Sequence, residues 1–143
     1  MKEAVILAGG KGTRLQSVLG GLPKPLADVG GVPLLGHQLR LLQLHGFEEA
    51  VLLVSHRADA IQAWIDTEAE ALGFRVRLVD DQPPRGTGGA ILNVLSDLAE
   101  VFAVLYGDTM LDVDLDRFWA WHAAEPATAV RSEEHTSELQ SPC

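Results

Sequence analysis

The first fifteen residues constrain the fold of this chain more than any other segment. The apolar run 4–7 (AVIL) leads directly into the glycine-rich segment 8–14 (AGGKGTR). A short apolar run is typical of a buried parallel strand. Glycines that follow a strand allow left-handed dihedrals and let backbone N–H groups approach phosphate oxygens. We therefore expect an α/β domain whose first strand ends at a nucleotide phosphate site, to which Thr13 adds a hydroxyl and Arg14 a guanidinium.

The spelling of this segment excludes two common nucleotide-binding loops. A P-loop requires GxxxxGK followed by Ser or Thr, whereas Lys11 is followed by Gly12. A dinucleotide-binding GxGxxG that begins at Gly10 requires glycine at position 15, which is Leu15. A glycine-rich segment alone can also be an ordinary turn between a strand and a helix, so the rest of the chain has to decide.

The distribution of charge indicates an anionic ligand. The net charge of the chain is −9, which excludes a broad basic face for nucleic acid, yet all three lysines lie within the first 24 residues. A small basic region in an acidic protein concentrates a polyanion at one place, although scarce lysines can also cluster by chance. Lys24 is the most telling of them, because Pro23 and Pro25 hold its backbone extended.

Three later segments, taken together with residues 7–15 (LAGGKGTRL), resemble the signature of the sugar-phosphate nucleotidyltransferases, also called nucleoside-diphosphate-sugar pyrophosphorylases. They are residues 23–26 (PKPL), 85–90 (RGTGGA) and 106–109 (YGDT). Four matches in the family's order within 110 residues make the resemblance specific. Residues 20–25 (GGLPKP) and 111–115 (LDVDL) are most similar to the heptose-type guanylyltransferases, and the resemblance favours guanylyl transfer to mannose 1-phosphate or a heptose 1-phosphate.

The resemblance implies a reaction and a role for three residues. A phosphate oxygen of a sugar 1-phosphate attacks the α-phosphorus of a nucleoside triphosphate, and pyrophosphate leaves, so catalysis depends on positioning and charge neutralisation. Arg14 would neutralise the β- and γ-phosphates, and Lys24 would contact the α-phosphate and the sugar phosphate. Asp108 follows an apolar strand and Gly107, and would hold Mg²⁺. The alternative for Asp108 is a turn-capping aspartate.

Asp81 stands five residues before Gly86, where the family places a Gln or Glu that reads the base. A carboxylate there accepts hydrogen bonds from guanine, which favours GTP over UTP and dTTP. The alternatives are uridylyl or thymidylyl transfer, with Asp80 and Asp81 as exposed loop charges. The nucleotide-binding residues implied by the resemblance are Leu7, Ala8, Gly9, Gly10, Gly12, Thr13, Arg14, Asp81, Gly86 and Thr87.

The remaining pattern predicts a Rossmann-like, doubly wound, mostly parallel sheet, a truncated form of the GT-A-like nucleotidyltransferase fold. Strands are expected at 2–8, 51–54, 74–79 and 101–106. Helices are expected at 33–45, from a cap at Asp59 to Leu72, at 87–99, and after a cap at Asp114. Strands and helices that alternate in this way form a parallel sheet covered on both faces.

We expect residues 1–130 to be the N-terminal part of a nucleotidyltransferase domain, cut within a strand that opens at 127–130. Residues 131–143 interrupt the apolar pattern, and their first twelve residues resemble a translated sequencing adapter, so we interpret them as a foreign tail. The chain as printed is expected to be inactive, because the family's later Lys, its second metal-ligating Asp and its sugar pocket are missing. A non-catalytic nucleotide-sensing domain is the alternative of another class.

The expected partners are a nucleoside triphosphate and a sugar 1-phosphate, with no nucleic acid and no membrane, and a homo-oligomer stays open. The sequence has no signal peptide and no apolar run that would cross a bilayer, so a cytoplasmic protein is expected.

Overall fold

The computed structural model describes residues 1–10, 14 and 16–124. The chain splits into two units, Met1–Asp112 and Val113–Cys143, and each is described by itself. The first unit contains the sheet and the predicted site. In the second unit the structure describes one helix.

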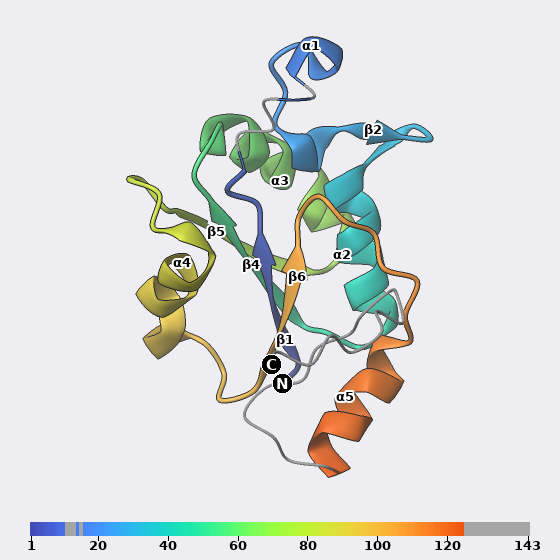
Figure 1. Cartoon of the computed structure of the whole chain (residues 1–143). Coiled ribbons are helices and arrows are strands. Elements are labelled where there is room, and N and C mark those ends of the chain that lie inside the picture. The colour runs from blue at the N-terminus through green and yellow to red at the C-terminus, as the bar shows by residue number, and fades with distance from the viewer. Residues whose placement is uncertain (11–13, 15, 125–143) are drawn as a thin grey trace, which may run out of the picture. The chain divides into compact units, whose positions relative to one another are not determined.

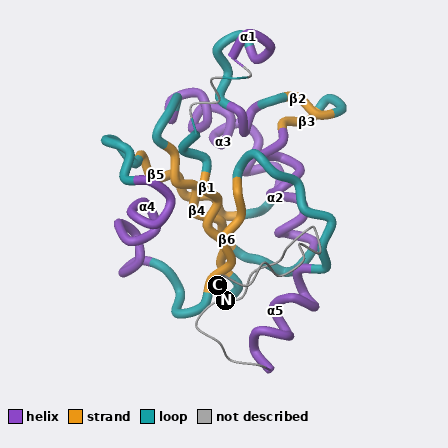
Figure 2. Tube along the Cα trace, in the orientation of Figure 1, coloured by secondary structure: helices purple, strands orange, loops and turns teal. Residues whose placement is uncertain are grey.

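A four-stranded parallel sheet forms the centre of the first unit (Figure 2). Its strands are β1 (Glu3–Leu7), β4 (Glu49–Val54), β5 (Arg75–Asp80) and β6 (Phe102–Tyr106), in the order β5-β4-β1-β6. All neighbours are parallel, and in the two central strands Val5 is aligned with Val51. The predicted Rossmann-like parallel sheet is therefore confirmed, and all four carboxyl ends lie at one edge.

Helices cover both faces of this sheet (Figure 1). Ala90 and Val94 of α4 (Gly86–Val94) pack in one buried cluster with Val5, Val51 and Leu53 of the strands. On the opposite side, α2 (Leu34–Leu44) buries Leu35, Leu39 and Leu42, which recur at the spacing of one helix face. Helix α3 (Ala58–Leu72) places the Trp64 ring next to Gly36 of α2. A Cβ on Gly36 would lie in ordinary contact with this ring, at 3.4 Å, but only 2.9 Å from Val32 Cγ1.

Four short elements between β1 and α2 were not expected from the sequence. They are α1 (Gln16–Leu19), the 3-10 turn η1 (Lys24–Leu26), and a hairpin of β2 (Asp28–Val29) with β3 (Val32–Pro33). The hairpin turns at Gly30 and Gly31, whose φ values of 64° and 86° favour glycine. Two adjacent glycines between apolar residues are a recognised hairpin signal, so this element could have been predicted.

The helix predicted at 87–99 is too long. Helix α4 ends at Val94, a 3-10 turn η2 (Leu95–Asp97) follows, and the chain then runs without helical structure to β6. Beyond η2, the buried Glu3 carboxylate accepts a hydrogen bond of 2.6 Å from the backbone N–H of Ala99. That donor is therefore bound to β1 and not to a continued helix.

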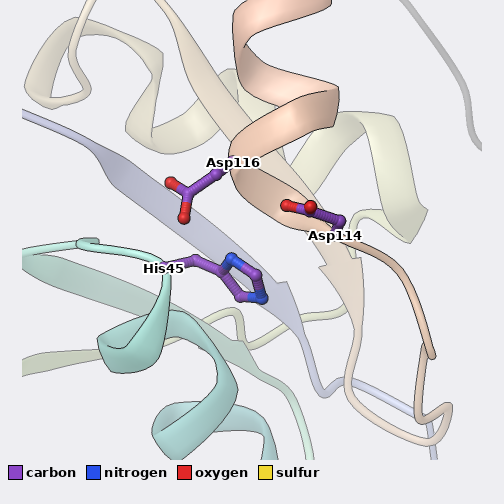
Figure 3. A group of neighbouring side chains, drawn as sticks. All are labelled: His45, Asp114 and Asp116. Atoms are coloured by element: carbon purple, nitrogen blue, oxygen red, sulfur yellow. The ribbon is translucent and has the colours of Figure 1, made fainter.

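In the second unit, Asp114 caps α5 (Leu115–Ala124) as predicted, since its Oδ1 accepts the backbone N–H of Arg117 at 3.0 Å. Figure 3 shows Asp114 and Asp116 at the start of this helix, and His45 where α2 ends. The predicted helix cap at Asp59 is wrong, because α3 begins at Ala58 and Asp59 lies inside its first turn. The strand expected at 127–130 lies outside the described residues. No described helix has the length and apolar character needed to span a bilayer.

Candidate active site

The carboxyl ends of the four strands surround a cavity of about 330 Å³, a volume typical of small-molecule sites. Nine of the predicted site residues line it, and they come from four separate segments of the chain: Leu7, Ala8, Gly9, Gly10, Lys24, Asp81, Gly86, Thr87 and Asp108. Parallel sheets bind ligands at this edge. The structure thus brings together most of the residues that the four motifs singled out.

The segment after β1 is held close to the end of β4. The backbone N–H of Ala8 donates to Leu53 O at 2.9 Å, and Ser55 Oγ donates to Gly9 O at 2.5 Å. A Cβ on Gly9 would lie 2.9 Å from Ser55 Oγ, whereas one on Gly10 would meet nothing within 4 Å. The expected left-handed dihedrals are wrong for these two glycines, whose φ values are not positive. Gly9 is needed for close approach instead.

Asp108 is placed by an equally close approach of β6 to β1. The backbone N–H of Gly107 donates to Leu7 O at 2.8 Å, and a Cβ on Gly107 would lie only 3.0 Å from that oxygen and 3.2 Å from Ala8 Cα. Glycine at 107 therefore allows the ends of two strands to meet. As a consequence, Asp108 lies directly beside the glycine-rich segment.

Lys24 reaches the same point from η1, where the backbone forms a 3-10 turn, so the extended backbone expected at Lys24 is wrong. Its Nζ lies 3.5 Å from Asp108 Oδ2, and the two side chains are 28% and 50% exposed. An ion pair this open to water contributes little to stability. The arrangement instead leaves one cation and one carboxylate accessible to a ligand in the cavity.

The other side of the cavity carries the Asp81 carboxylate, which is hydrogen-bonded to Arg85. Asp81 is 4% exposed, so the alternative of an exposed loop charge is wrong for Asp81, although Asp80 is exposed. Asp81 Oδ1 accepts Arg85 Nη1 at 2.7 Å, and its Oδ2 accepts the backbone N–H of Arg85 at 3.0 Å. Each carboxylate oxygen accepts about two hydrogen bonds, and Arg85 uses one on each oxygen of a side chain that lines the cavity.

Three predicted residues are not seen at the cavity. Gly12 and Thr13 lie outside the described residues. Arg14 is exposed, in the turn before α1, and is not among the residues that line the cavity.

Sequence reasoning missed Ser55, which lines the cavity and binds the carbonyl of Gly9. The signal was available, because Ser55 is the first polar residue after the apolar strand 51–54, just as Asp81 directly follows β5 and Asp108 follows β6 after Gly107. Each of these side chains follows a strand at the ligand-binding edge.

The fold and the cavity define an α/β nucleotide-binding domain, with glycine-rich backbone, a cation and a carboxylate at one strand edge. The chain belongs to the MobA-like NTP transferase family, whose domain model matches residues 4–141.

Relatives of this chain are sugar-phosphate nucleotidyltransferases. It is 36% identical over 115 residues to the D-glycero-alpha-D-manno-heptose 1-phosphate guanylyltransferase of Campylobacter jejuni, covering 80% of this chain and 51% of the relative. It is 34% identical over 126 residues to the mannose-1-phosphate guanylyltransferase of Mycobacterium tuberculosis, covering 87% and 35%. Among solved structures, HddC from Yersinia pseudotuberculosis complexed with GMP-PN matches with a TM-score of 0.76 and 36% identity, over 85% of this chain and 54% of that one. This chain therefore spans about half the length of the Campylobacter and Yersinia proteins and about a third of the Mycobacterium protein.

Proposed function

We propose that this chain forms the nucleotide-binding part of a sugar-1-phosphate guanylyltransferase. In the full-length protein, a phosphate oxygen of a mannose or heptose 1-phosphate attacks the α-phosphorus of GTP. The bond from that phosphorus to the oxygen bridging the β-phosphate breaks, so that a GDP-sugar forms and pyrophosphate leaves. The observation that carries this proposal is the 3.5 Å approach of Lys24 to Asp108 at a cavity bordered by glycine-rich backbone.

Charge neutralisation is the main task in this reaction, because negative charge builds up on phosphate oxygens as the bond breaks. Lys24 offers an ammonium that is partly exposed at the cavity. When a triphosphate binds, Lys24 exchanges its carboxylate partner for phosphate oxygens on the α-phosphate and on the incoming sugar phosphate. The family resemblance assigns Arg14 to the β- and γ-phosphates through its two-pronged donor geometry, although Arg14 does not line the cavity in this structure.

Asp108 fits the requirements of a magnesium ligand. Its carboxylate is half exposed and lines the cavity, and Mg²⁺ in nucleotide sites is bound by one or two carboxylates together with substrate phosphates. Asp108 would hold the ion, and the ion would supply positive charge between the phosphates. When Asp108 and Lys24 separate, Asp108 would pair with the Mg²⁺ ion and Lys24 with phosphate oxygens, so each group would keep a partner of opposite charge.

Asp81 supports guanine as the base. Arg85 fixes the direction of its carboxylate, and the remaining acceptor positions suit the N1–H and exocyclic amine of guanine. Uracil and thymine present acceptor oxygens that a carboxylate repels, and cytosine lacks the ring N–H donor. The relation to guanylyltransferases supports the same base.

The test is pyrophosphate release by the full-length protein with GTP, CTP, UTP or dTTP, each paired with mannose 1-phosphate or a heptose 1-phosphate. We expect GTP to give the highest kcat/KM with one of these sugars. If another triphosphate is preferred, the assignment of the base is wrong while the transferase assignment stands. If GTP binds and no sugar phosphate reacts, the protein is a nucleotide-sensing domain instead.

A further inference from the structure

A buried amide on α2 holds the turn that carries Asp108. Gln38 is 1% exposed, and its Nε2 donates two hydrogen bonds of 2.8 Å, one to Tyr106 O and one to Thr109 O. These carbonyls are the two ends of a turn that the backbone N–H of Thr109 closes on Tyr106 O. Gly107 and Asp108 are the two central residues of that turn. Gln38 thus binds both of its ends.

The amide is oriented by chemistry, because only its NH₂ group can face two carbonyl oxygens. Its own oxygen, Gln38 Oε1, has no hydrogen-bond partner in the described part of the chain. A buried acceptor without a donor costs free energy, and an apolar side chain of similar shape would avoid that cost. Gln38 is therefore better explained by what its NH₂ group holds than by core stability.

Helix α2 also restrains the segment that carries Lys24. At its first residue, the backbone N–H of Leu34 donates to Ala27 O at 2.9 Å, directly after η1. Helix α2 is thus hydrogen-bonded both to Ala27, just after η1, and to the turn that contains Asp108. Helix α2 therefore links the two segments that carry Lys24 and Asp108.

We propose that Gln38 is a positioning residue that fixes the Asp108 carboxylate at the cavity so that it can hold the divalent cation that accompanies the triphosphate. The inference rests on the proposed function, since it assumes a metal-bound nucleotide at this edge. It predicts that loss of the amide weakens the metal-dependent part of nucleotide binding. The metal-free part depends on the glycine-rich segment and stays nearly constant.

The test compares Gln38→Met with Gln43→Met in the full-length protein. Gln43 lies on the same helix, is exposed, and also donates through Nε2 to a backbone carbonyl, that of Leu72. GTP affinity is measured by calorimetry in EDTA and in excess Mg²⁺, and the ratio of the two affinities is compared. We expect Gln38→Met to lower this ratio at least about tenfold while the EDTA affinity changes less than about twofold, and Gln43→Met to leave both unchanged.

A merely structural role would lower both affinities together or neither, so an unchanged ratio in Gln38→Met overturns the proposal. Electron paramagnetic resonance of Mn²⁺ added with GTP gives a second readout, and saturating Mn²⁺ should restore affinity to the variant. If Gln38→Met does not fold, Gln38→Asn keeps a buried amide that is one methylene too short, and it must show the same loss. A wild-type protein whose GTP affinity ignores Mg²⁺ refutes the proposed function together with this inference.

Discussion

The two sides of the cavity treat charge in opposite ways. On the side of β1 and β6, Lys24 and Asp108 are 28% and 50% exposed and meet each other at 3.5 Å. On the side of β5, the Asp81 carboxylate is 6% exposed and is held by two hydrogen bonds from Arg85. Groups that must change partners stay accessible, whereas a group that must only present a fixed shape is buried and held. The first side suits phosphates and the second suits a base.

Loss of the carboxylate on the phosphate side should have the largest effect. We expect Asp108→Asn to lower kcat/KM of the full-length protein at least about a thousandfold at ordinary Mg²⁺, because the amide keeps the shape and removes the charge. The matched control is Asp80→Asn, an exposed aspartate at the end of β5, which should stay within about twofold. Full turnover by Asp108→Asn would place the metal elsewhere.

Loss of the cation should have the next largest effect. We expect Lys24→Ala to lower kcat/KM at least about a hundredfold, since a positioned donor to the charge that develops in the transition state contributes on this scale. Thermal unfolding should change little, because the ion pair is exposed to water. A variant that keeps activity within a few fold of wild type would remove Lys24 from the mechanism.

The close approach that supports the phosphate side can be tested through stability. In Gly9→Ala the new Cβ would lie 2.9 Å from Ser55 Oγ, which is too close. We therefore expect the substitution to lower the free energy of unfolding by about 1–3 kcal/mol. Gly10→Ala meets open space and should cost far less. Adding Ser55→Ala to Gly9→Ala should restore part of the loss, as measured by denaturant titration. Equal effects at both glycines would contradict this account.

On the base side the effect should be smaller and selective. We expect Asp81→Asn to reduce the preference for GTP over UTP roughly tenfold, because the amide turns one acceptor toward the base into a donor. Steady-state kinetics with both triphosphates checks this, again with Asp80→Asn as the control. If the preference is unchanged, the Asp81 carboxylate serves only to hold Arg85.

The smallest effect concerns an ion pair whose two residues do not line the cavity. The Arg57 side chain, followed by the backbone N–H of Ala60, lowers the pKa of the Asp59 carboxyl below its ordinary value of 3.8. A lowered pKa means that this contribution to stability is present above the unfolded-state pKa and is lost as the pH falls through the folded-state pKa. Asp59→Asn should therefore lower Tm slightly at neutral pH and not at all in strong acid. A decrease in Tm that persists in acid would exclude this ion pair as its cause.

How far the sequence predicts the molecule depends on the range of the interactions involved. The strand ends were predictable, because apolar runs and the glycines or aspartates that follow them are local signals. The irregular backbone at Ala99, where a helix was expected, was not predictable, because the N–H of Ala99 is bound by Glu3, which lies 96 residues earlier in the sequence. The partner of Asp81 was missed for a different reason. Arg85 lies only four residues away, but the local turn that joins them is not visible in residue types alone.

The place of β1 in the sheet also governs the order in which the protein can assemble. This strand is the first of the four described strands along the chain, yet it lies between β4 and β6, whose first aligned residues are Glu49 and Phe102. During synthesis, both hydrogen-bonding edges of β1 therefore wait for partners, and the second edge waits until all four described strands have been made. The phosphate side of the cavity, which lies between β1 and β6, cannot form before the chain has been made as far as Asp108.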